Sequence, residues 1–405
     1  MTRRPALRRV VTLPLLVLYG LGVTIGAGIY VLIGATVAEA GMFAPTSFLL
    51  AAVVMGFTAL SFAELSGRRP EAAGEAAYVD AAFGRPWLTL AVGLGIVLSA
   101  VVAAAAITLG GAGYVLALVP APGWVAVTCI LVLMTAIAAW GVLESVTFAA
   151  ALTVLEIAGL LVIVFAGLWS DPGIVLRLPE VIPPLSDAGA LGAVFGASLI
   201  AFFAFIGFDD VVNLVEETKT PARIMPLGIL LTLGVATAIY FMVVSVAVLT
   251  TPTDLLAGSG APISVLFERL TGLPPLAITL IAIVATLNGI VIQIIMAARV
   301  LYGLSNAGRL PGVFARINPV THTPLASTLL IGGAALALAL IAPIGALAQA
   351  TTQIVLTVFV LVNLSLLIIK ARRDPAPAGA FLVPIWAPAC GALASAGLLI
   401  GPLFT

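Results

Sequence analysis

Charged residues are scarce in this chain of 405 residues. Asp, Glu, Lys and Arg together make up 8% of it, whereas 62% of the residues are hydrophobic. A soluble domain carries about 25% charged residues, so this composition excludes a soluble globular protein and predicts an all-α polytopic membrane protein. The 17 basic and 17 acidic residues cancel, and we therefore expect no nucleic acid as a partner.

Residues that bind metals or form disulfides are almost missing as well. His322 is the single histidine, and the two cysteines, Cys129 and Cys390, lie in separate apolar runs. This supply excludes a histidine-built metal site and a disulfide framework. We expect no metal and no cofactor, and we expect no catalytic residues, because no cluster of nucleophile, base or metal ligands is present to support a membrane enzyme.

Long apolar runs dominate the chain instead. At about 20 residues for each membrane span, these runs predict eleven transmembrane helices. Their ranges are 11–38, 45–66, 87–119, 123–142, 146–169, 188–213, 226–250, 273–304, 324–343, 346–370 and 379–401. The stretch 251–272 is only weakly apolar, and we expect short external helices there.

The basic residues predict an orientation for these helices. With the N-terminus in the cytoplasm, fifteen of the 17 Lys and Arg residues lie inside, and only Arg177 and Arg269 lie outside. This asymmetry follows the positive-inside rule. An odd number of spans then places the C-terminus outside. Because Arg far outnumbers Lys, as in GC-rich bacterial genomes, the expected location is a bacterial cytoplasmic membrane.

Two of the apolar segments contain interruptions. Residues 20–30 read GLGVTIGAGIY, and residues 202–210 read FFAFIGFDD. Lipid offers no partner to a free backbone N–H or C=O group, so broken helices persist only where they line a cavity inside the protein. Two breaks at the heads of the two halves indicate the binding site of a secondary transporter. A short, closed and mostly apolar pocket also argues against a channel.

Four ordered sequence blocks resemble the amino acid–polyamine–organocation (APC) transporters. The blocks are GAGIY at 26–30 with AGMFAP at 40–45, FAEL at 62–65 with the residues up to Tyr78, FFAFIGFD at 202–209 with EETK at 216–219, and RVLYGL at 299–304 leading to Thr323-Pro324. The resemblance implies amino acid permease activity, by alternating-access uptake or exchange of amino acids or related amines.

The same resemblance implies a LeuT-like fold, a five-plus-five inverted repeat with discontinuous helices 1 and 6. The two repeats would cover residues 11–169 and 188–370 of a single transport domain (1–405), and an extra helix would follow at 379–401. No sequence similarity between the halves is visible. The inverted repeat is therefore inferred from the number of spans and the two breaks.

The breaks suggest how a substrate would bind. N–H groups freed near residues 25–28 would face the substrate's carboxylate at the start of a half-helix. Carbonyl groups freed near residues 203–207 would accept from its ammonium group. Helix packing of the glycines and core packing of the phenylalanines are the alternatives. The expected substrate-binding residues are Ile25, Gly26, Ala27, Gly28, Phe203, Ala204 and Ile206.

Glu156 lies near the middle of the predicted helix 146–169. A charged side chain at that depth costs about 2.5–3.5 kcal/mol on insertion scales. In proton-coupled members of the APC family a lysine stands at this position, twelve residues after a Glu-Ser pair. Here Glu144-Ser145 is present, but Glu156 replaces the lysine. Three interpretations stay open: Glu156 carries the coupling proton, binds a cation, or is a protonated structural residue hydrogen-bonded to a neighbouring helix.

Further polar residues follow the same logic. The resemblance implies that Asp209 acts as a gate or steadies the broken helix, and Asp210 is expected at a cytoplasmic vestibule; a solvated helix end is the alternative for both. Asn288 and Gln293 could line the pathway or bond back onto their own helix. Glu64 is expected to pair with Lys or Arg at an inner helix end.

Together these features predict a proton-coupled carrier of small or medium neutral amino acids, because the expected pocket is apolar. Alternatives are an amino acid/amine exchanger and a sodium-coupled or uncoupled carrier of amines or polyamines. A substrate-sensing membrane receptor is the non-transporting alternative, since binding and translocation would use one pocket. The expected partners are a small-molecule substrate, protons and membrane lipid, and the sequence leaves the oligomeric state open.

Overall fold

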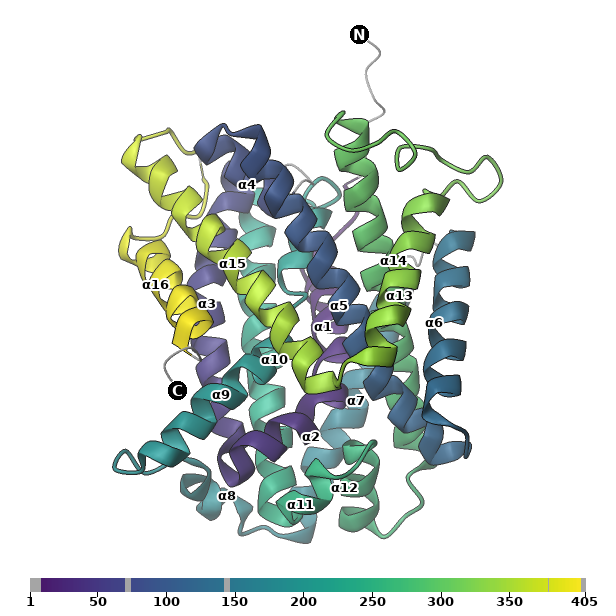
Figure 1. The fold of residues 1–405 in the computed structure, drawn as a ribbon. Coiled ribbons are helices and arrows are strands. Elements are labelled where there is room, and N and C mark those ends of the chain that lie inside the picture. Colours follow the sequence, from purple (N-terminus) through teal and green to yellow (C-terminus); the bar gives the residue numbers. More distant parts are fainter. Residues whose placement is uncertain (1–8, 70–73, 142–145, 378, 402–405) are drawn as a thin grey trace.

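The structure is a computed structural model, and its described part is almost entirely helical (Figure 1). This part comprises residues 9–69, 74–141, 146–377 and 379–401. Within it the chain forms sixteen α-helices and three 3₁₀ helices, and the only β-type contact is an isolated parallel bridge between Val11 and Thr218. The predicted all-α class is confirmed.

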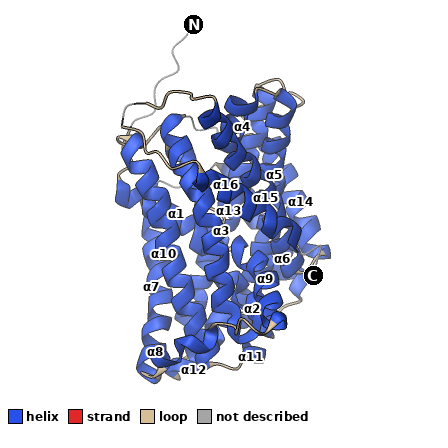
Figure 2. Cartoon of the chain, turned by 90° about the vertical axis from the view of Figure 1, so that its left-hand side faces the viewer, coloured by secondary structure: helices blue, strands red, loops and turns tan. Residues whose placement is uncertain are grey.

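The long helices run side by side along one axis, as Figures 1 and 2 show. Seven helical runs of the described residues are long and apolar enough to cross a membrane, and four shorter apolar helices accompany them. Each of the eleven predicted ranges overlaps one of these helices. The long helices are α3 (Ala44–Arg68), α5 (Pro86–Leu118), α6 (Gly123–Trp140), α7 (Val146–Ser170), α10 (Pro221–Thr250), α13 (Leu276–Asn306) and α15 (Ile344–Ala371). Two of the shorter apolar helices are α14 (Leu325–Ile341) and α16 (Trp386–Ile400).

Shorter elements connect or interrupt the long ones. Two short helices lie in the stretch 251–272, as predicted, whereas α4 and α8 were not expected from the sequence. The shorter elements are α1 (Leu13–Ala27), α2 (Ile29–Ala40), η1 (Gly41–Phe43), α4 (Gly74–Phe83), α8 (Ile174–Arg177), η2 (Leu178–Val181), α9 (Ala188–Phe203), η3 (Asp209–Leu214), α11 (Thr253–Ala257) and α12 (Pro262–Thr271).

The last helix is shorter than the predicted range 379–401. Helix α16 has 15 residues, or about 22 Å at 1.5 Å per residue, which is less than the ~30 Å of a hydrocarbon core. Pro384 disfavours helical geometry at Val383. Both backbone groups of Val383 are bound from elsewhere: its N–H donates to Glu64 (2.7 Å) and its carbonyl accepts from Lys370 (2.6 Å). The chain is therefore held in a non-helical form there.

Glu64 is the centre of this contact between three helices. Its buried carboxylate pairs with Arg68 Nε at 2.8 Å on the same helix and with Lys370 Nζ at 2.7 Å on α15. The expected pairing of Glu64 with basic residues is confirmed. The pair and the bond to Val383 join α3, α15 and the approach to α16 at one end of the molecule.

Aromatic rings form much of the core around the second interruption. Phe62 packs edge-on against Phe208 and Phe359, with ring centroids 5.7 and 5.4 Å apart. Phe205 lies 5.0 Å from the ring of Tyr240 and 6.4 Å from that of Phe48. Core packing was the alternative interpretation of the phenylalanines near the second break. It applies to Phe205, whose side chain is fully buried.

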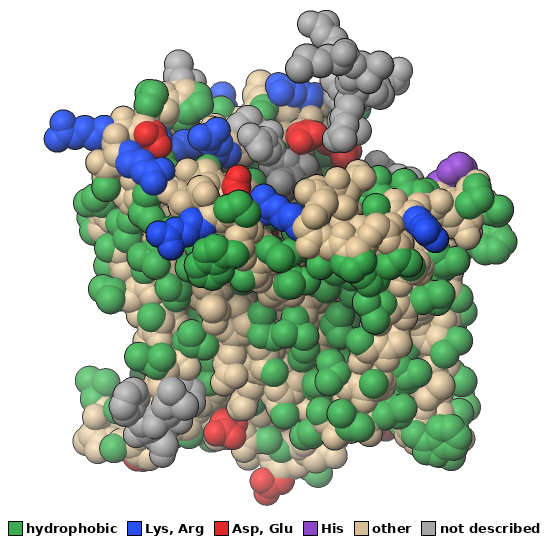
Figure 3. Space-filling model, turned by 45° about the horizontal axis from the view of Figure 1, so that its top comes forward, with side chains coloured by type: hydrophobic (Ala, Val, Ile, Leu, Met, Phe, Trp, Pro, Cys, Tyr) green, Lys and Arg blue, Asp and Glu red, His purple; other side chains and the backbone are tan. Residues whose placement is uncertain are grey.

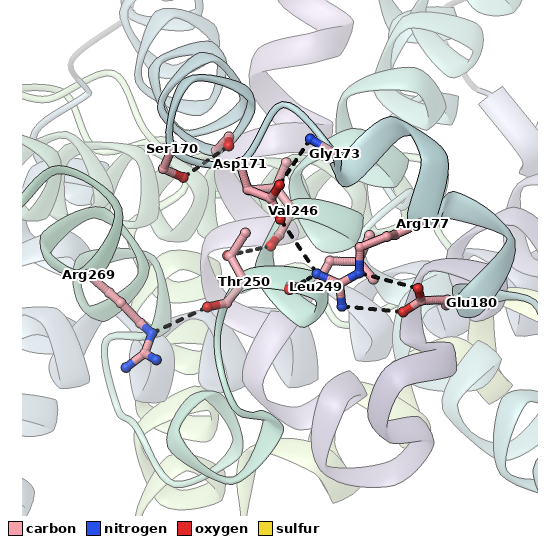
Figure 4. A network of polar contacts seen from close by, with 10 residues as sticks. Ser170, Asp171, Gly173, Arg177, Glu180, Val246, Leu249, Thr250 and Arg269 are labelled. Atoms are coloured by element: carbon pink, nitrogen blue, oxygen red, sulfur yellow. Dashed lines mark hydrogen bonds and ion pairs between the residues drawn. The ribbon is translucent and has the colours of Figure 1, made fainter.

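The ends of the molecule differ in charge. Figure 3 shows Lys and Arg gathered at the upper end, above a flank that is mostly hydrophobic. At the opposite end, Arg177 donates to the carbonyl of Leu249 (3.2 Å) and pairs with Glu180 (3.2 Å), while Arg269 donates to the carbonyl of Thr250 (3.3 Å) (Figure 4). The carbonyl end of a helix attracts cations, so the last turn of α10 partly neutralises both arginines.

Candidate functional site

The first interruption separates α1 from α2 at Gly28. The Gly28 N–H donates to the carbonyl of Ile25 at 3.2 Å, and the Gly28 carbonyl accepts from Val31 and Leu32 at 3.2 and 3.0 Å. Gly28 itself has φ −103° and ψ −83°. The break is therefore narrower than the expected stretch 25–28, because α1 stays helical up to Ala27. Among the described residues, the N–H groups of Ile29 and Tyr30 at the start of α2 have no backbone acceptor.

The second interruption follows the end of α9 at Phe203 and precedes η3 at Asp209. Tight turns use some of its backbone groups: Phe203 O accepts from Ile206 N–H at 3.1 Å. Asp209 Oδ1 accepts from Gly207 N–H at 2.9 Å, so this carboxylate braces the break. Of the two roles that the resemblance implied for Asp209, the contact supplies the support of the broken helix.

The two interruptions touch each other. A Cβ atom on Gly28 would stand 2.5 Å from the carbonyl oxygen of Ala204. Gly207 has φ +118°, which favours glycine, and a Cβ there would stand 2.7 Å from Val23 Cγ1. Only glycine permits so close an approach at both positions. A separate bridge between Val11 and Thr218 also joins the start of α1 to the chain after η3.

Tyr240 on α10 bridges both breaks, and its residue type was the only signal for it in the sequence. Its hydroxyl lies 2.9 Å from the carbonyl oxygen of Thr24 and 2.8 Å from that of Ala204. A hydroxyl has one hydrogen to donate, so it serves one carbonyl at a time. The carbonyl of Ala204, expected to accept from a substrate ammonium, already faces a protein donor.

Two more buried tyrosines form hydrogen bonds to backbone carbonyls near the first break. Tyr114 on α5 donates to the carbonyl of Tyr30 at 2.6 Å. Tyr30 in turn donates to the backbone carbonyl of Glu156 at 2.8 Å. These bonds link α5, α2 and α7 in series, and each satisfies a backbone carbonyl that is buried away from water.

Glu156 lies where α7 meets the first break. Its side chain is buried, with 1% exposure. Glu156 Oε2 and the carbonyl oxygen of Ala285 on α13 stand 3.4 and 3.0 Å from the point where a Cβ of Gly26 would be. Both oxygen acceptors therefore lie close to the same residue of α1. Glu144 and Ser145, the pair that precedes Glu156 in the sequence, lie outside the described residues.

The expected substrate contacts are mostly enclosed. Ile25 and Ala204 have no exposed surface, Phe203 is 2% exposed, and Gly26 and Gly28 are buried. The side chain of Ala27 lies outside the described part of the structure. Ile206 differs from these residues, because it is partly exposed. In this conformation the region between the breaks is closed.

A cavity of about 700 Å³ begins where that closed region ends. It reaches Ile206, Asp209 and Asp210 but none of the other expected substrate or coupling residues. Its walls come from α4, α5, η3, α13 and α15. The polar residues that line it are Glu75, Asp80, Thr89, Ser99, Asp209, Asp210, Glu217, Gln293, Arg299 and Arg309.

The carboxylates of this cavity have unequal partners. Asp80 accepts a hydrogen bond from Thr89 (2.7 Å) and lies 3.7 Å from Arg309. For Glu75, burial and then the charge of Asp209 raise the pKa to about 8. Sequence reasoning missed Glu75, although an acidic residue inside the block that follows the second span was a usable signal.

The two amide side chains that the sequence analysis named, those of Asn288 and Gln293, have different surroundings in the structure. Gln293 lines the cavity and is 7% exposed. Asn288 is equally buried, and among the described residues its Oδ1 atom has no hydrogen-bond partner. The lining role expected for both therefore applies to Gln293 in this cavity, while Asn288 lies deeper along α13.

Comparisons with known proteins agree with this architecture. The profile of the family described as amino acid permease matches residues 13–405. The branched-chain amino acid permease BcaP of Bacillus subtilis is 30% identical over 386 residues, which cover 89% of this chain and 81% of that protein. The methylthioribose transporter of the same organism is 29% identical, covering 91% of this chain and 82% of that protein.

A plant relative has a different substrate in its name. The vacuolar cationic amino acid transporter 2 of Arabidopsis thaliana is 31% identical over 391 residues, which cover 90% of this chain and 60% of that protein. These matches extend over nearly the whole chain and include both interruptions. The chain belongs to the amino acid permease family of the APC superfamily, whose members are membrane transporters and not enzymes.

Proposed function

We propose that this permease takes up small or medium neutral amino acids by alternating access, driven by protons. The breaks at Gly28 and at residues 204–208 form the substrate site, and Glu156 carries the coupling proton. The observation that carries this proposal is the position of the Glu156 carboxylate, buried beside Gly26. Carboxylates inside membrane-spanning helices are the groups that relay protons in pumps and transporters.

Proton binding at this place would act directly on the substrate site. Glu156 borders α1 at Gly26, two residues before Gly28, and the chain at Gly28 touches Ala204. Losing the proton would leave a charge beside Gly26 and favour a shift of α1. One charge that crosses ~100 mV supplies about 2.3 kcal/mol, which supports a substrate gradient of roughly fiftyfold.

The side chains around the breaks favour a neutral substrate. The apolar surface comes from Phe203, Ala204 and Ile206. In the contacts described above, Glu156 supplies the single carboxylate next to the first break. An amino acid would therefore bind through its backbone groups, with its carboxylate at the N–H groups that open α2. Its side chain would lie against Ile206 and Phe203.

The conformation fits a carrier that is open to one side. Arg299 and Arg309, from the region where α13 ends, line the cavity, and Lys and Arg gather at one end of the molecule (Figure 3). The positive-inside rule assigns this end to the cytoplasm. We infer an inward-facing state in a bacterial cytoplasmic membrane, within a five-plus-five inverted repeat that covers 11–169 and 188–370. A C-terminus outside stays a prediction.

Sodium coupling is the second candidate. The oxygens of Glu156 and Ala285 and the buried Oδ1 of Asn288 are hard ligands of the kind that bind alkali cations. A sodium ion could then occupy the place that a proton takes in the first proposal. Exchange without any coupling ion, as in an amine antiporter, would need no ionisable group at this position.

Uptake into proteoliposomes separates these candidates. The purified protein is reconstituted and tested by counterflow with labelled alanine, leucine, lysine and methylthioribose, and then with a pH gradient or a sodium gradient. We expect counterflow with the neutral amino acids and accumulation only under the pH gradient. Accumulation that needs sodium and ignores pH would overturn proton coupling, and counterflow with lysine alone would overturn the substrate class. Binding without counterflow would indicate a receptor.

A further inference from the structure

Besides Glu217, three carboxylates of the cavity have no basic partner among the described residues. Glu75 comes from α4, and Asp209 and Asp210 come from the start of η3. Among the described residues, no Lys or Arg lies within 4 Å of any of the three, whereas Asp80 in the same cavity has Arg309. Their charges act on one another. A group of uncompensated carboxylates favours a cation as its neighbour.

Gln293 provides an independent indication of a ligand. It comes from a different helix, α13, it lines the same cavity, and its residue surface is 93% buried. Within the described residues its amide makes no hydrogen bond, although buried amides are nearly always paired. The amide is therefore available to a ligand in the cavity.

We propose that Glu75, Asp210 and Gln293 form a second binding site, on the inner side of the breaks, for the ammonium group of the departing substrate or of a simple alkylamine. An ammonium group has three donors and no acceptor, and these side chains supply acceptors from three elements. Asp209 adds charge to the site while its Oδ1 is held by Gly207. This site rests on the proposed amino acid transport and extends it.

The rest of the cavity suits an aliphatic substrate. Ile206, Val355 and Phe359 form an apolar wall on the side of the breaks. A volume of about 700 Å³ exceeds that of any amino acid, so a ligand here would keep part of its hydration. The site would then release an amino acid in two steps, first from the breaks and then from the carboxylates.

Binding of leucine analogues tests this site. The probes are 3-methylbutylamine, which keeps the ammonium group, and 4-methylpentanoate, which keeps only the carboxylate. Direct binding is measured with the purified full-length protein in lipid nanodiscs. We expect the amine to bind and the acid not to bind, with a loss of affinity of about tenfold or more in Glu75→Gln and Asp210→Asn, the size typical of a hydrogen bond to a charged group.

Matched variants keep the result interpretable. Asp80→Asn removes a carboxylate from the same helix and cavity, but one that is already paired, and should leave amine affinity unchanged. Glu75→Asp keeps the charge and should retain most of the affinity, which separates loss of charge from misfolding. Gln293→Leu should weaken amine binding severalfold.

Three outcomes would overturn the site: equal amine affinity in the wild type and in Glu75→Gln, equal losses in Asp80→Asn and Glu75→Gln, or displacement of the amine by sodium at the amine's own concentration. Leucine counterflow is measured on the same preparations. If wild-type counterflow is absent while amine binding depends on Glu75, the transport proposal fails and the site stands. If counterflow is intact while amine binding ignores Glu75, the site fails alone.

Discussion

Two groups of carboxylates occupy different environments in this molecule. Glu156 is enclosed between α1, α7 and α13 and lies against the first break. Glu75, Asp209 and Asp210 line a cavity that is large enough for water and ligand. The same chemical group is thus placed once where only a proton or a small cation fits and once where a substrate fits.

Under the proposed function, this difference would assign the two regions to different steps of transport. A proton bound at Glu156 would control the arrangement of the broken helices, because it alters the charge beside Gly26. A cation bound near Glu75 leaves that arrangement alone and instead holds the substrate on its way out. Changes at the breaks should therefore affect every transport mode, whereas changes in the cavity should affect release.

The largest effect is expected from Gly28→Ala. The new Cβ atom would stand 2.5 Å from the backbone oxygen of Ala204, so the two breaks must separate. A misplacement of about 1 Å at a functional site can cost about a hundredfold in rate, and we expect a loss of that size in leucine counterflow. Gly56→Ala is the control, because a Cβ there meets no atom within 4 Å. Wild-type counterflow in Gly28→Ala would contradict the contact.

Removing one hydroxyl from Tyr240 should have a smaller effect. Tyr240→Phe leaves the ring contacts with Phe205 and Phe48 in place but deletes the donor to Thr24 and Ala204. The loss of a buried hydrogen bond costs about 1–3 kcal/mol. We expect a lower melting temperature and about tenfold slower counterflow.

Tyr302→Phe serves as the comparison for Tyr240→Phe. The hydroxyl of Tyr302 only accepts a weak 3.4 Å bond from Asn306 at an exposed helix end. If both tyrosine variants behave alike, the bridge between the two breaks contributes nothing specific to transport.

The smallest effect is a pH dependence of amine binding in the cavity. Burial and the charge of Asp209 raise the pKa of Glu75 to about 8, so this side chain becomes ionised between pH 7 and pH 9, while an alkylamine with a pKa near that of lysine stays protonated. Affinity for 3-methylbutylamine should rise severalfold over this range and should rise less in Glu75→Gln. Asp80, Asp209, Asp210, Glu217, Arg299 and Arg309 also face the cavity and are present in both proteins.

The same shift has a consequence for stability. The folded protein binds the Glu75 proton more tightly than the unfolded chain does, so this residue destabilises the fold as pH rises from about 4.5 to 8. Thermal unfolding of Glu75→Gln should be less sensitive to pH than that of the wild type between about pH 5 and pH 8. An identical pH profile for both proteins would remove Glu75 as the titrating group.

The sequence predicted the helices well because long apolar runs have one stable form in lipid. It also located both breaks, through Gly26, Gly28 and Gly207. It predicted too long a first break. Helix α1 continues to Ala27, because the hydrogen bonds of its backbone do not depend on polar side chains. The sequence overestimated the last helix, because the capture of Val383 by Glu64 and Lys370 depends on residues more than 300 and 10 positions away.

The site was harder to predict than the fold. Asp209 was identified because it follows the break directly. Tyr240 and Glu75 were missed because their roles depend on contacts between elements that are distant in sequence, and a tyrosine in an apolar helix or a glutamate in a connecting helix is unremarkable on its own. Local patterns thus located the broken backbone, and tertiary packing decided which side chains meet it.

Proton-driven accumulation by Glu156→Gln tests the proposed coupling most directly. Proteoliposomes containing wild type or variant are given an acidic exterior, and labelled leucine is followed in accumulation and in equilibrium exchange. We expect the variant to retain exchange, because glutamine mimics the protonated carboxyl, and to lose accumulation against a gradient. Full pH-driven accumulation by Glu156→Gln would show that the coupling proton is carried elsewhere.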